Sequence, residues 1–194
     1  MHFRCVPIPT ETARRFRAAE TDDGGNPIIR RIATGHGEPC RHCLRLAEAG
    51  EVMLLLSWHL PRPRSVYWTP SPIFLHEKDC PAWTEQDSIP PIVRNSLISV
   101  RAYDGDGMCL YDLGQVAEGP EADAPLARAL ADPRTEFVNI HTAKPGCLLC
   151  SAEVVRTDSR SCSERSRTNS APPNSYNFIT NRDPARAPAA PPRH

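Results

Sequence analysis

The amino-acid sequence predicts a single α+β domain, built mainly from an antiparallel sheet of hairpins with a few short helices. Two apolar runs, 52–58 and 72–76, flank a proline-rich segment, as expected of two strands joined by a loop. A third run, 97–103, alternates in polarity and leads into the turn sequence Asp-Gly-Asp-Gly. Because the helical stretches between such runs are short, the hairpins decide the predicted fold class.

The N-terminal segment predicts a strand over 3–8 and then a helix that extends to about residue 20. Thr10 is the predicted N-cap of this helix, although the glutamate of a full capping box is missing. An aspartate- and glycine-rich turn at 22–27 leads into a predicted strand at 28–33.

Further along the chain, residues 40–49 predict a tight knuckle and about two helical turns, closed by Gly50. The remaining predicted elements are a hairpin partner for the third run at 108–113, a helix at 125–131, and strands at 136–141 and 147–155. These elements place the folded domain within residues 3–156.

The composition of the chain changes at Thr157. Residues 157–194 contain six serines and six prolines, and their only apolar stretch is 176–179. Such a segment cannot bury enough apolar surface to offset the entropy of ordering it. We therefore expect residues 157–194 to form a disordered tail outside the folded domain.

The charge of the chain is balanced, with 23 basic and 23 acidic residues. This balance argues against nucleic acid as a partner, because phosphate contacts need clustered basic charge. The longest apolar run, 52–56, is too short to cross a bilayer, and the first residues lack the apolar core of a secretory signal. We expect a cytoplasmic protein without a membrane partner, and the sequence identifies no other partner.

Eight cysteines are many for a chain of 194 residues. In a reducing compartment, paired cysteines indicate metal or redox chemistry before structural disulfides. The sharpest pattern is Cys-x2-Cys at Cys40 and Cys43, followed about thirty residues later by His-x3-Cys at His76 and Cys80. Zinc takes four thiolate or imidazole ligands, and closely spaced pairs present them well.

The predicted strand pairing supports this ligand set. If 52–58 and 72–76 pair antiparallel, His76 lies near Met53, and Cys80 returns to the end of the sheet where the knuckle lies. A zinc ion bound by Cys40, Cys43, His76 and Cys80 is the first prediction for the site.

Cys147 and Cys150 form a second Cys-x2-Cys pair and define a second-ranked ligand set with the knuckle cysteines. In a regular strand the two side chains would face opposite sides of the sheet, which makes Cys150 a core residue. His42 and His141 are weaker candidates, because an exposed or hydrogen-bonded histidine is the commoner state. The alternative for the whole pattern is chance spacing in a cysteine-rich chain.

Other kinds of chemistry leave weaker signals. A redox pair would use Cys40 as a nucleophile at a helix N-terminus, but no βαβ pattern surrounds it. No hydrolase motif is present, so the sequence identifies no catalytic residue and leaves enzymatic activity undecided. Tyr67 and Trp68, on the proline-rich loop, could contact a ligand, although packing over the sheet is favoured.

Several segments together resemble a known family: 39–44, 47–56, 72–76, 100–104 and 146–150. They are similar to the bacterial family called domain of unknown function 1203, over about residues 3–156. The resemblance implies a small single-domain bacterial protein and implies no activity. The segment after residue 156 departs from the family pattern.

Three functional hypotheses follow. The first is a zinc-binding α+β module in which zinc is structural. The second is a thiol- or metal-dependent enzyme of unknown substrate, which would need an open coordination position. The third, nucleic-acid binding through the zinc knuckle, is disfavoured by the charge balance.

Overall fold

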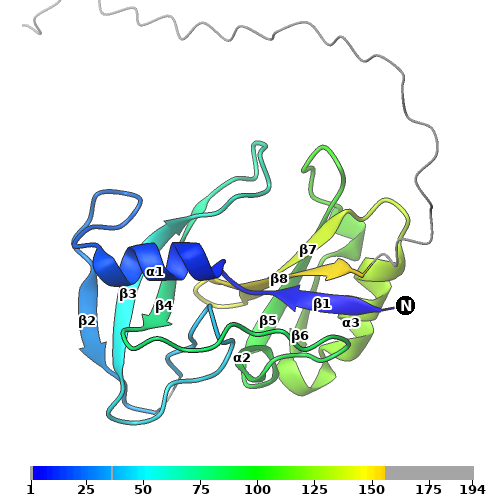
Figure 1. The fold of residues 1–194 in the computed structure, drawn as a ribbon. Helices are drawn as coiled ribbons and strands as arrows, with labels where there is room; N and C mark the ends of the chain where they lie inside the picture. The colour runs from blue at the N-terminus through cyan, green and yellow to red at the C-terminus, as the bar shows by residue number, and fades with distance from the viewer. Residues whose placement is uncertain (1, 36, 156–194) are drawn as a thin grey trace, which may run out of the picture. The chain divides into compact units, whose positions relative to one another are not determined.

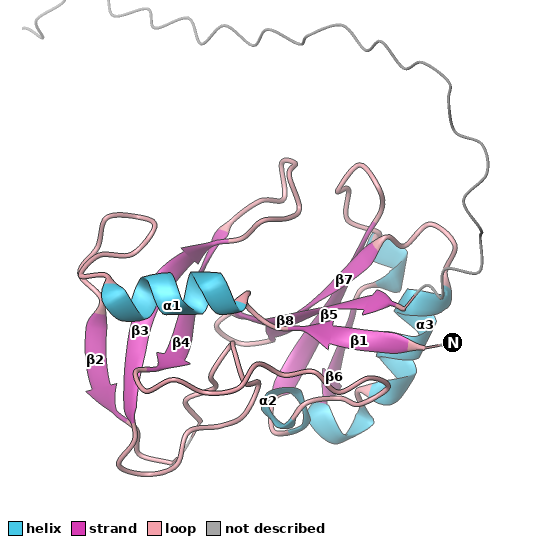
Figure 2. Cartoon of the chain, in the orientation of Figure 1, coloured by secondary structure: helices cyan, strands magenta, loops and turns pink. Residues whose placement is uncertain are grey.

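The computed structural model describes residues 2–35 and 37–155. Within these residues the chain forms two antiparallel sheets with three α-helices, which confirms the predicted α+β class (Figures 1 and 2). The strands are β1 Phe3–Val6, β2 Ile29–Ile32, β3 Val52–His59, β4 Pro70–His76, β5 Leu97–Tyr103, β6 Gln115–Glu118, β7 Phe137–Thr142 and β8 Leu148–Val154. The helices are α1 Thr10–Ala18, α2 Pro91–Arg94 and α3 Asp123–Ala131.

The larger sheet has five strands in the order β1-β8-β7-β5-β6. Strict alternation along β5 buries Ile98, Val100 and Ala102 on one face, against α3. Leu126 of α3 and Ile140 of β7 belong to the same core cluster. The opposite face of β5 carries polar and aromatic side chains, because residues two apart on a strand share a face.

The smaller sheet has three strands in the order β2-β3-β4. Met53 of β3 pairs with His76 of β4, as the sequence predicts. A second core lies between this sheet and α1, where Phe16 is fully buried beside Met53 and Leu75. Figure 1 shows α1 lying over β3 and β4.

Arg41 connects the segment between the sheets to the larger sheet. Its guanidinium is buried and donates hydrogen bonds to the carbonyl oxygens of Leu148, at 2.8 Å, and Pro39, at 2.6 Å. Burial lowers the pKa of Arg41 to about 10, although nearby cysteines act in the opposite direction. The backbone amide of Leu148 also links the two sheets, since it donates a hydrogen bond to Ser71 Oγ of the smaller sheet at 2.9 Å.

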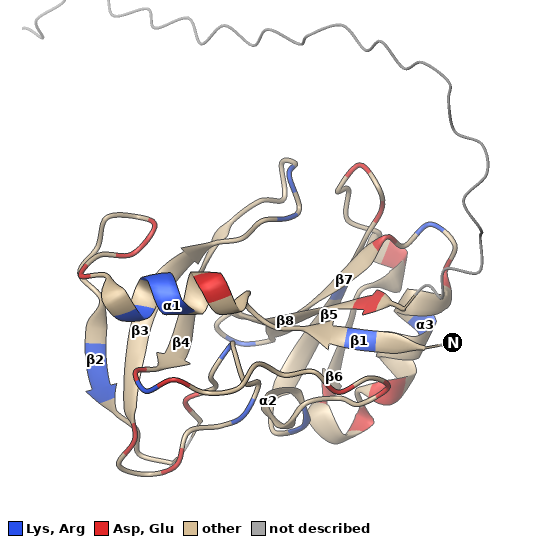
Figure 3. Ribbon diagram, in the orientation of Figure 1, with Lys and Arg blue, Asp and Glu red and all other residues tan. Residues whose placement is uncertain are grey.

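Charged residues of both signs lie close together along the ribbon (Figure 3). Arg4 contacts Glu153 at 2.6 Å, which ties β1 to β8 at the level of side chains. Arg62, from the long loop after β3, reaches the same carboxylate at 2.8 Å. No helix in the described part of the chain is both long and apolar enough to cross a membrane.

Three local predictions are wrong. Pro9, not Thr10, holds the N-cap position of α1, because proline presets the backbone there and its carbonyl accepts from the Ala13 amide. No helix follows Cys40, because the amides of this segment bond across a tight turn. Residues 108–113 are not a strand.

The hairpin after β5 pairs only briefly, through a bridge between Tyr103 and Cys109. A 3-10 turn at Tyr111–Leu113 then buries Leu113. Pairing with β5 resumes only at β6, which the sequence did not predict. The predicted tail, 157–194, lies outside the described residues, so the domain boundary at 156 stays a prediction.

Candidate metal centre

Four side chains converge between the smaller sheet and the segment that precedes it. Cys40, Cys43, His76 and Cys80 each offer one donor atom, and these four atoms lie within 4.8 Å of one another. The first two come from the turn before β3, and the other two come from the end of β4 and the loop that follows. They are the four residues of the first predicted ligand set.

Two of the spacings between donor atoms match those of a tetrahedral ion. The sulfur atoms of Cys40 and Cys80 are 3.9 Å apart, and Cys43 Sγ is 3.5 Å from His76 Nδ1. A tetrahedral zinc with bonds of about 2.3 Å to sulfur and about 2.0 Å to nitrogen separates its ligands by about 3.8 Å and 3.5 Å respectively. The cluster therefore has the dimensions of a metal site.

A tight turn presents the first two sulfur atoms. The amide of Leu44 donates to the carbonyl of Cys40 at 3.0 Å, and the Cys40 amide donates to Arg45 at 2.9 Å. Leu44 has a φ of 53°, a left-handed conformation that lets the chain reverse directly after Cys43. The turn lies alongside β4, because the Arg41 amide bonds to the Phe74 carbonyl at 3.0 Å.

The imidazole of His76 is oriented from its far side. Nε2 lies 3.2 Å from Glu51 Oε2, a carboxylate oxygen that can only accept. Nε2 therefore carries a proton, and when the ring is neutral this leaves the lone pair of Nδ1 on the side of Cys43. A carboxylate that holds the outer nitrogen of a histidine in this way is the usual support for a metal-binding imidazole.

Arg17 of α1 lies against Cys80. Its guanidinium donates to Cys80 Sγ at 3.2 Å, to Asp79 at 2.6 Å and to the His76 carbonyl at 3.0 Å. The Arg17 side chain is only 10% exposed. Three thiolates around a divalent ion leave one net negative charge, and a buried cation beside them stabilises that charge.

His42 lies beside the cluster without belonging to it. Its Nδ1 is 3.4 Å from Cys80 Sγ, and its Nε2 is 3.0 Å from the Thr10 hydroxyl. Burial lowers the pKa of His42, and the charge of Arg17 acts in the same direction. A neutral His42 can donate a hydrogen bond to a thiolate at Cys80 while the Thr10 hydroxyl donates to its other nitrogen.

Electrostatics within the cluster favours a cation. Hydrogen bonds from Cys43 and Cys80 lower the pKa of Cys40, which favours its thiolate. Hydrogen bonds with Cys40 and Cys43 raise the pKa of His76 to about 10. Contact with Cys40 raises the pKa of Cys80. Without a metal, protons supply the positive charge that these sulfur atoms require.

The structure does not bring the second-ranked pair to this cluster. Cys147 lies just before β8 and is half-buried, whereas Cys150 lies in the larger core and is 2% exposed, as predicted. Contact with Cys5 and burial raise the pKa of Cys150. His141 lies on β7, in a different pocket.

A thioredoxin-type redox pair would need a helix that begins at Cys40. The structure has a turn there, and the Cys40 and Cys43 side chains are 0% and 3% exposed. A buried thiol without a helix N-terminus lacks the setting that activates such a nucleophile.

Sequence reasoning missed Glu51 and Arg17. The pairing of β3 with β4 offered a signal for Glu51, because a residue just before β3 lies near the end of β4. Arg17 gave no signal, since α1 is about sixty positions away from Cys80 in the sequence.

Fold and cluster together define an α+β protein with a Cys3His site able to hold a metal ion. The chain belongs to a family of proteins of unknown function, DUF1203, whose sequence model matches residues 37–154. This match covers all four cluster residues. No curated protein and no solved structure matches the chain. The family brings no activity with it, so function rests on the site.

Proposed function

We propose that this protein is a zinc-binding module in which a structural zinc ion is held by Cys40, Cys43, His76 and Cys80. The observation that supports this most strongly is the convergence of four donor atoms within 4.8 Å, with two of the pairs at the separations of a tetrahedral zinc site, 3.9 Å between two sulfurs and 3.5 Å between sulfur and nitrogen. Three thiolates and one imidazole favour zinc over magnesium or calcium, which prefer oxygen ligands.

A structural role follows from the number and burial of the donors. Four protein ligands complete the coordination of zinc and leave no position for substrate or water. The alternative, a thiol- or metal-dependent enzyme, would need one of the four to be displaced. Cys40 and Cys43 are buried, and His76 is held by Glu51 on its far side, so the structure favours retention.

Zinc in this position would join three separate parts of the fold. It would link the turn at 40–43 to the end of β4 and, through Arg17, to α1. The turn has no helix and no long strand pairing of its own. We infer that the metal takes the place of such pairing and stabilises the packing of the second core.

The site also bears on cellular location. All seven cysteines in the described part of the chain are free, and zinc binding needs three of them as thiolates. A reducing compartment preserves that state, which supports a cytoplasmic location.

X-ray absorption at the zinc edge tests the ligand set directly. The proposal requires three sulfur neighbours near 2.3 Å and one nitrogen near 2.0 Å, on the usual bond lengths. Four sulfur neighbours would instead assign the site to the set that contains Cys147 and Cys150. Fewer than three sulfur neighbours, with a light atom in the place of a sulfur, would mean an open site and would favour the enzymatic alternative.

A further inference from the structure

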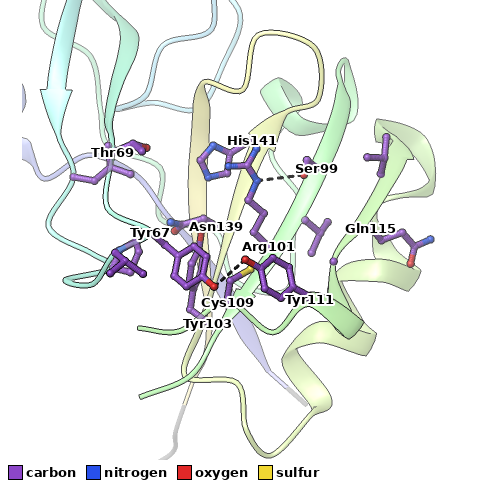
Figure 4. Close-up of a pocket in the computed structure, with 16 residues that line it drawn as sticks. Tyr67, Thr69, Ser99, Arg101, Tyr103, Cys109, Tyr111, Gln115, Asn139 and His141 are labelled. Carbon is purple, nitrogen blue, oxygen red and sulfur yellow. Dashed lines mark hydrogen bonds between the residues drawn. The ribbon is translucent and has the colours of Figure 1, made fainter. Parts of the chain in front are cut away.

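A cavity of about 570 Å³ lies on the face of the larger sheet that α3 does not cover. Its floor is the polar face of β5 and β7, and its walls come from the loop after β3 and from the turn at Tyr111–Leu113 (Figure 4). None of its sixteen lining residues belongs to the metal cluster. The volume is within the range of small-molecule sites, roughly 300–1,000 Å³.

Strand register brings the polar floor together. Ser99 of β5 pairs with His141 of β7, and Arg101 of β5 pairs with Asn139 of β7. Paired residues on neighbouring strands point to the same face, so all four side chains meet at the floor. Figure 4 shows Arg101 extending from its strand towards Ser99 and His141.

Arg101 is the only Arg, Lys, Asp or Glu among the lining residues. In the described part of the chain it forms no ion pair with a carboxylate; its Nε makes a long contact of 3.4 Å to the Ser99 hydroxyl, and its side chain also interacts with Tyr103. A guanidinium in a largely apolar cavity attracts one negative charge, and its planar donors match a carboxylate. The cavity therefore favours a small organic monoanion.

His141 supplies an acceptor beside this cation. Its Nδ1 is 2.8 Å from the Gly146 carbonyl, and a carbonyl only accepts, so Nδ1 carries the ring proton. Burial, aided by the charge of Arg101, lowers the pKa of His141 to about 4, so the ring is neutral. Nε2 is a buried acceptor without a partner among the described residues.

A buried acceptor without a partner is costly, which makes Nε2 a strong site for a donor. The contact of Arg101 with Ser99 is long, and its other partner, Tyr103, is an uncharged phenol, so the guanidinium can turn towards a bound anion without breaking an ion pair. A hydroxyl next to the carboxylate of that anion could then reach His141.

Aromatic rings form the wall opposite the floor. The hydroxyl groups of Tyr67 and Tyr111 are 2.8 Å apart, which joins the loop after β3 to the 3-10 turn. Tyr67 also contacts Tyr103 edge to face, with ring centroids 6.4 Å apart. Such rings pack well against a flat apolar ligand body.

We propose that this cavity binds an aromatic 2-hydroxy carboxylate, with Arg101 on the carboxylate, His141 Nε2 accepting from the hydroxyl, and the tyrosines around the ring. The inference is independent of the metal. It assigns to Tyr67 the ligand contact that the sequence left as the less favoured interpretation, and it leaves Trp68 outside the cavity.

The test is calorimetric titration of the full chain, as purified, with 3-phenyllactate and with 3-phenylpropionate, which lacks the hydroxyl. We expect phenyllactate to bind, and Arg101→Gln to weaken its binding at least tenfold, the usual effect of losing a charged hydrogen bond. Arg31→Gln is the matched control, because Arg31 is exposed on β2 and lies outside the cavity. It should bind phenyllactate as the wild type does.

The hydroxyl contact is tested by a double comparison. The wild type should prefer phenyllactate over phenylpropionate about fivefold or more, on the magnitude of a neutral hydrogen bond. His141→Phe should abolish that preference while thermal melting shows that the variant is folded. The proposal is overturned if neither phenyllactate nor mandelate binds at millimolar concentration, or if Arg101→Gln binds phenyllactate as tightly as Arg31→Gln does. An unchanged hydroxyl preference in folded His141→Phe would also overturn it.

Discussion

Cys43 Sγ lies 3.5 Å from His76 Nδ1, although 33 positions separate the two residues in the sequence. The contact exists because β3 and β4 pair antiparallel, which returns the chain to the turn that holds Cys43. Glu51 completes the arrangement from the far side of the same ring, at 3.2 Å. Each of these contacts can be removed separately by a single substitution.

Glu51→Gln should weaken zinc binding about 10- to 100-fold, the usual cost of losing the carboxylate behind a metal-binding histidine. The amide keeps the size of the side chain but removes the charge that fixes the proton on His76 Nε2. Competition against a chromophoric chelator measures the affinity. Glu48→Gln is the control, because the Glu48 side chain is exposed and its contacts with Glu51 are made by its backbone amide and carbonyl. Equal affinities for the two variants would contradict the role of Glu51.

Arg17→Met should lower the free energy of unfolding by about 2 kcal/mol, because it removes charged hydrogen bonds to Cys80 and to the His76 carbonyl. Urea denaturation of the zinc-loaded protein measures the change. Arg14→Met, one turn earlier on α1, is the control, since the Arg14 side chain is 65% exposed. It should change stability by less than about 0.5 kcal/mol. A similar loss of stability in both variants would show that Arg17 contributes only through its position in α1 and not through its contacts with the cluster.

His141 should make the protein less stable as the pH falls. Its pKa is about 4 in the folded state and 6.5 as the reference value. A lowered histidine pKa means that the unfolded chain binds the proton more readily. The stabilisation is therefore complete above about pH 6.5 and is lost as the pH falls towards 4. Over that window the loss amounts to about 3 kcal/mol.

Urea denaturation between pH 4 and 7 checks this dependence. Arg101 is the charged group that faces the ring. His141→Phe should show a shallower decline in stability than the wild type. Parallel curves for the two proteins would mean that His141 titrates normally when folded.

Deleting residues 157–194 should leave the melting temperature unchanged within error. The prediction rests on composition, because this segment has few apolar residues to contribute to a core. Thermal melting of the full and shortened chains measures it, and limited proteolysis of the full chain should give a stable fragment of about 17 kDa. A clear drop in melting temperature, or the absence of such a fragment, would contradict it.

The sequence was sufficient for the part of the metal cluster that depends on strand pairing. Two apolar runs around a proline-rich loop predict the hairpin of β3 and β4, and the pairing of Met53 with His76 follows from it. The short spacings within the two ligand pairs are visible in the sequence itself. The tight knuckle at Cys40 was predicted, but the two helical turns expected after it are absent, because the backbone of this segment bonds across the turn and to β4 instead.

The cavity could not be predicted, because its floor comes from strands that are neighbours only in the fold. Arg101 and His141 lie 40 positions apart, and α3 intervenes between them. The one available signal was the alternation of Ser99 and Arg101 with buried apolar residues, which indicates a polar face but not what meets it. The strand β6 was not predicted either, because the 3-10 turn at Tyr111–Leu113 interrupts the hairpin before the chain pairs with β5 again.

The zinc content of the full chain, purified under reducing conditions without added metal, tests the central claim most directly. Native mass spectrometry with and without chelator should show one zinc ion per chain, and its removal should lower the melting temperature sharply. Structural zinc contributes on the order of 10 kcal/mol, comparable to the net stability of a domain. Cys43→Ser and His76→Ala should each reduce zinc content and melting temperature together, whereas Cys147→Ser should change neither. A chain that carries no zinc, and whose melting chelator leaves unchanged, would contradict the claim.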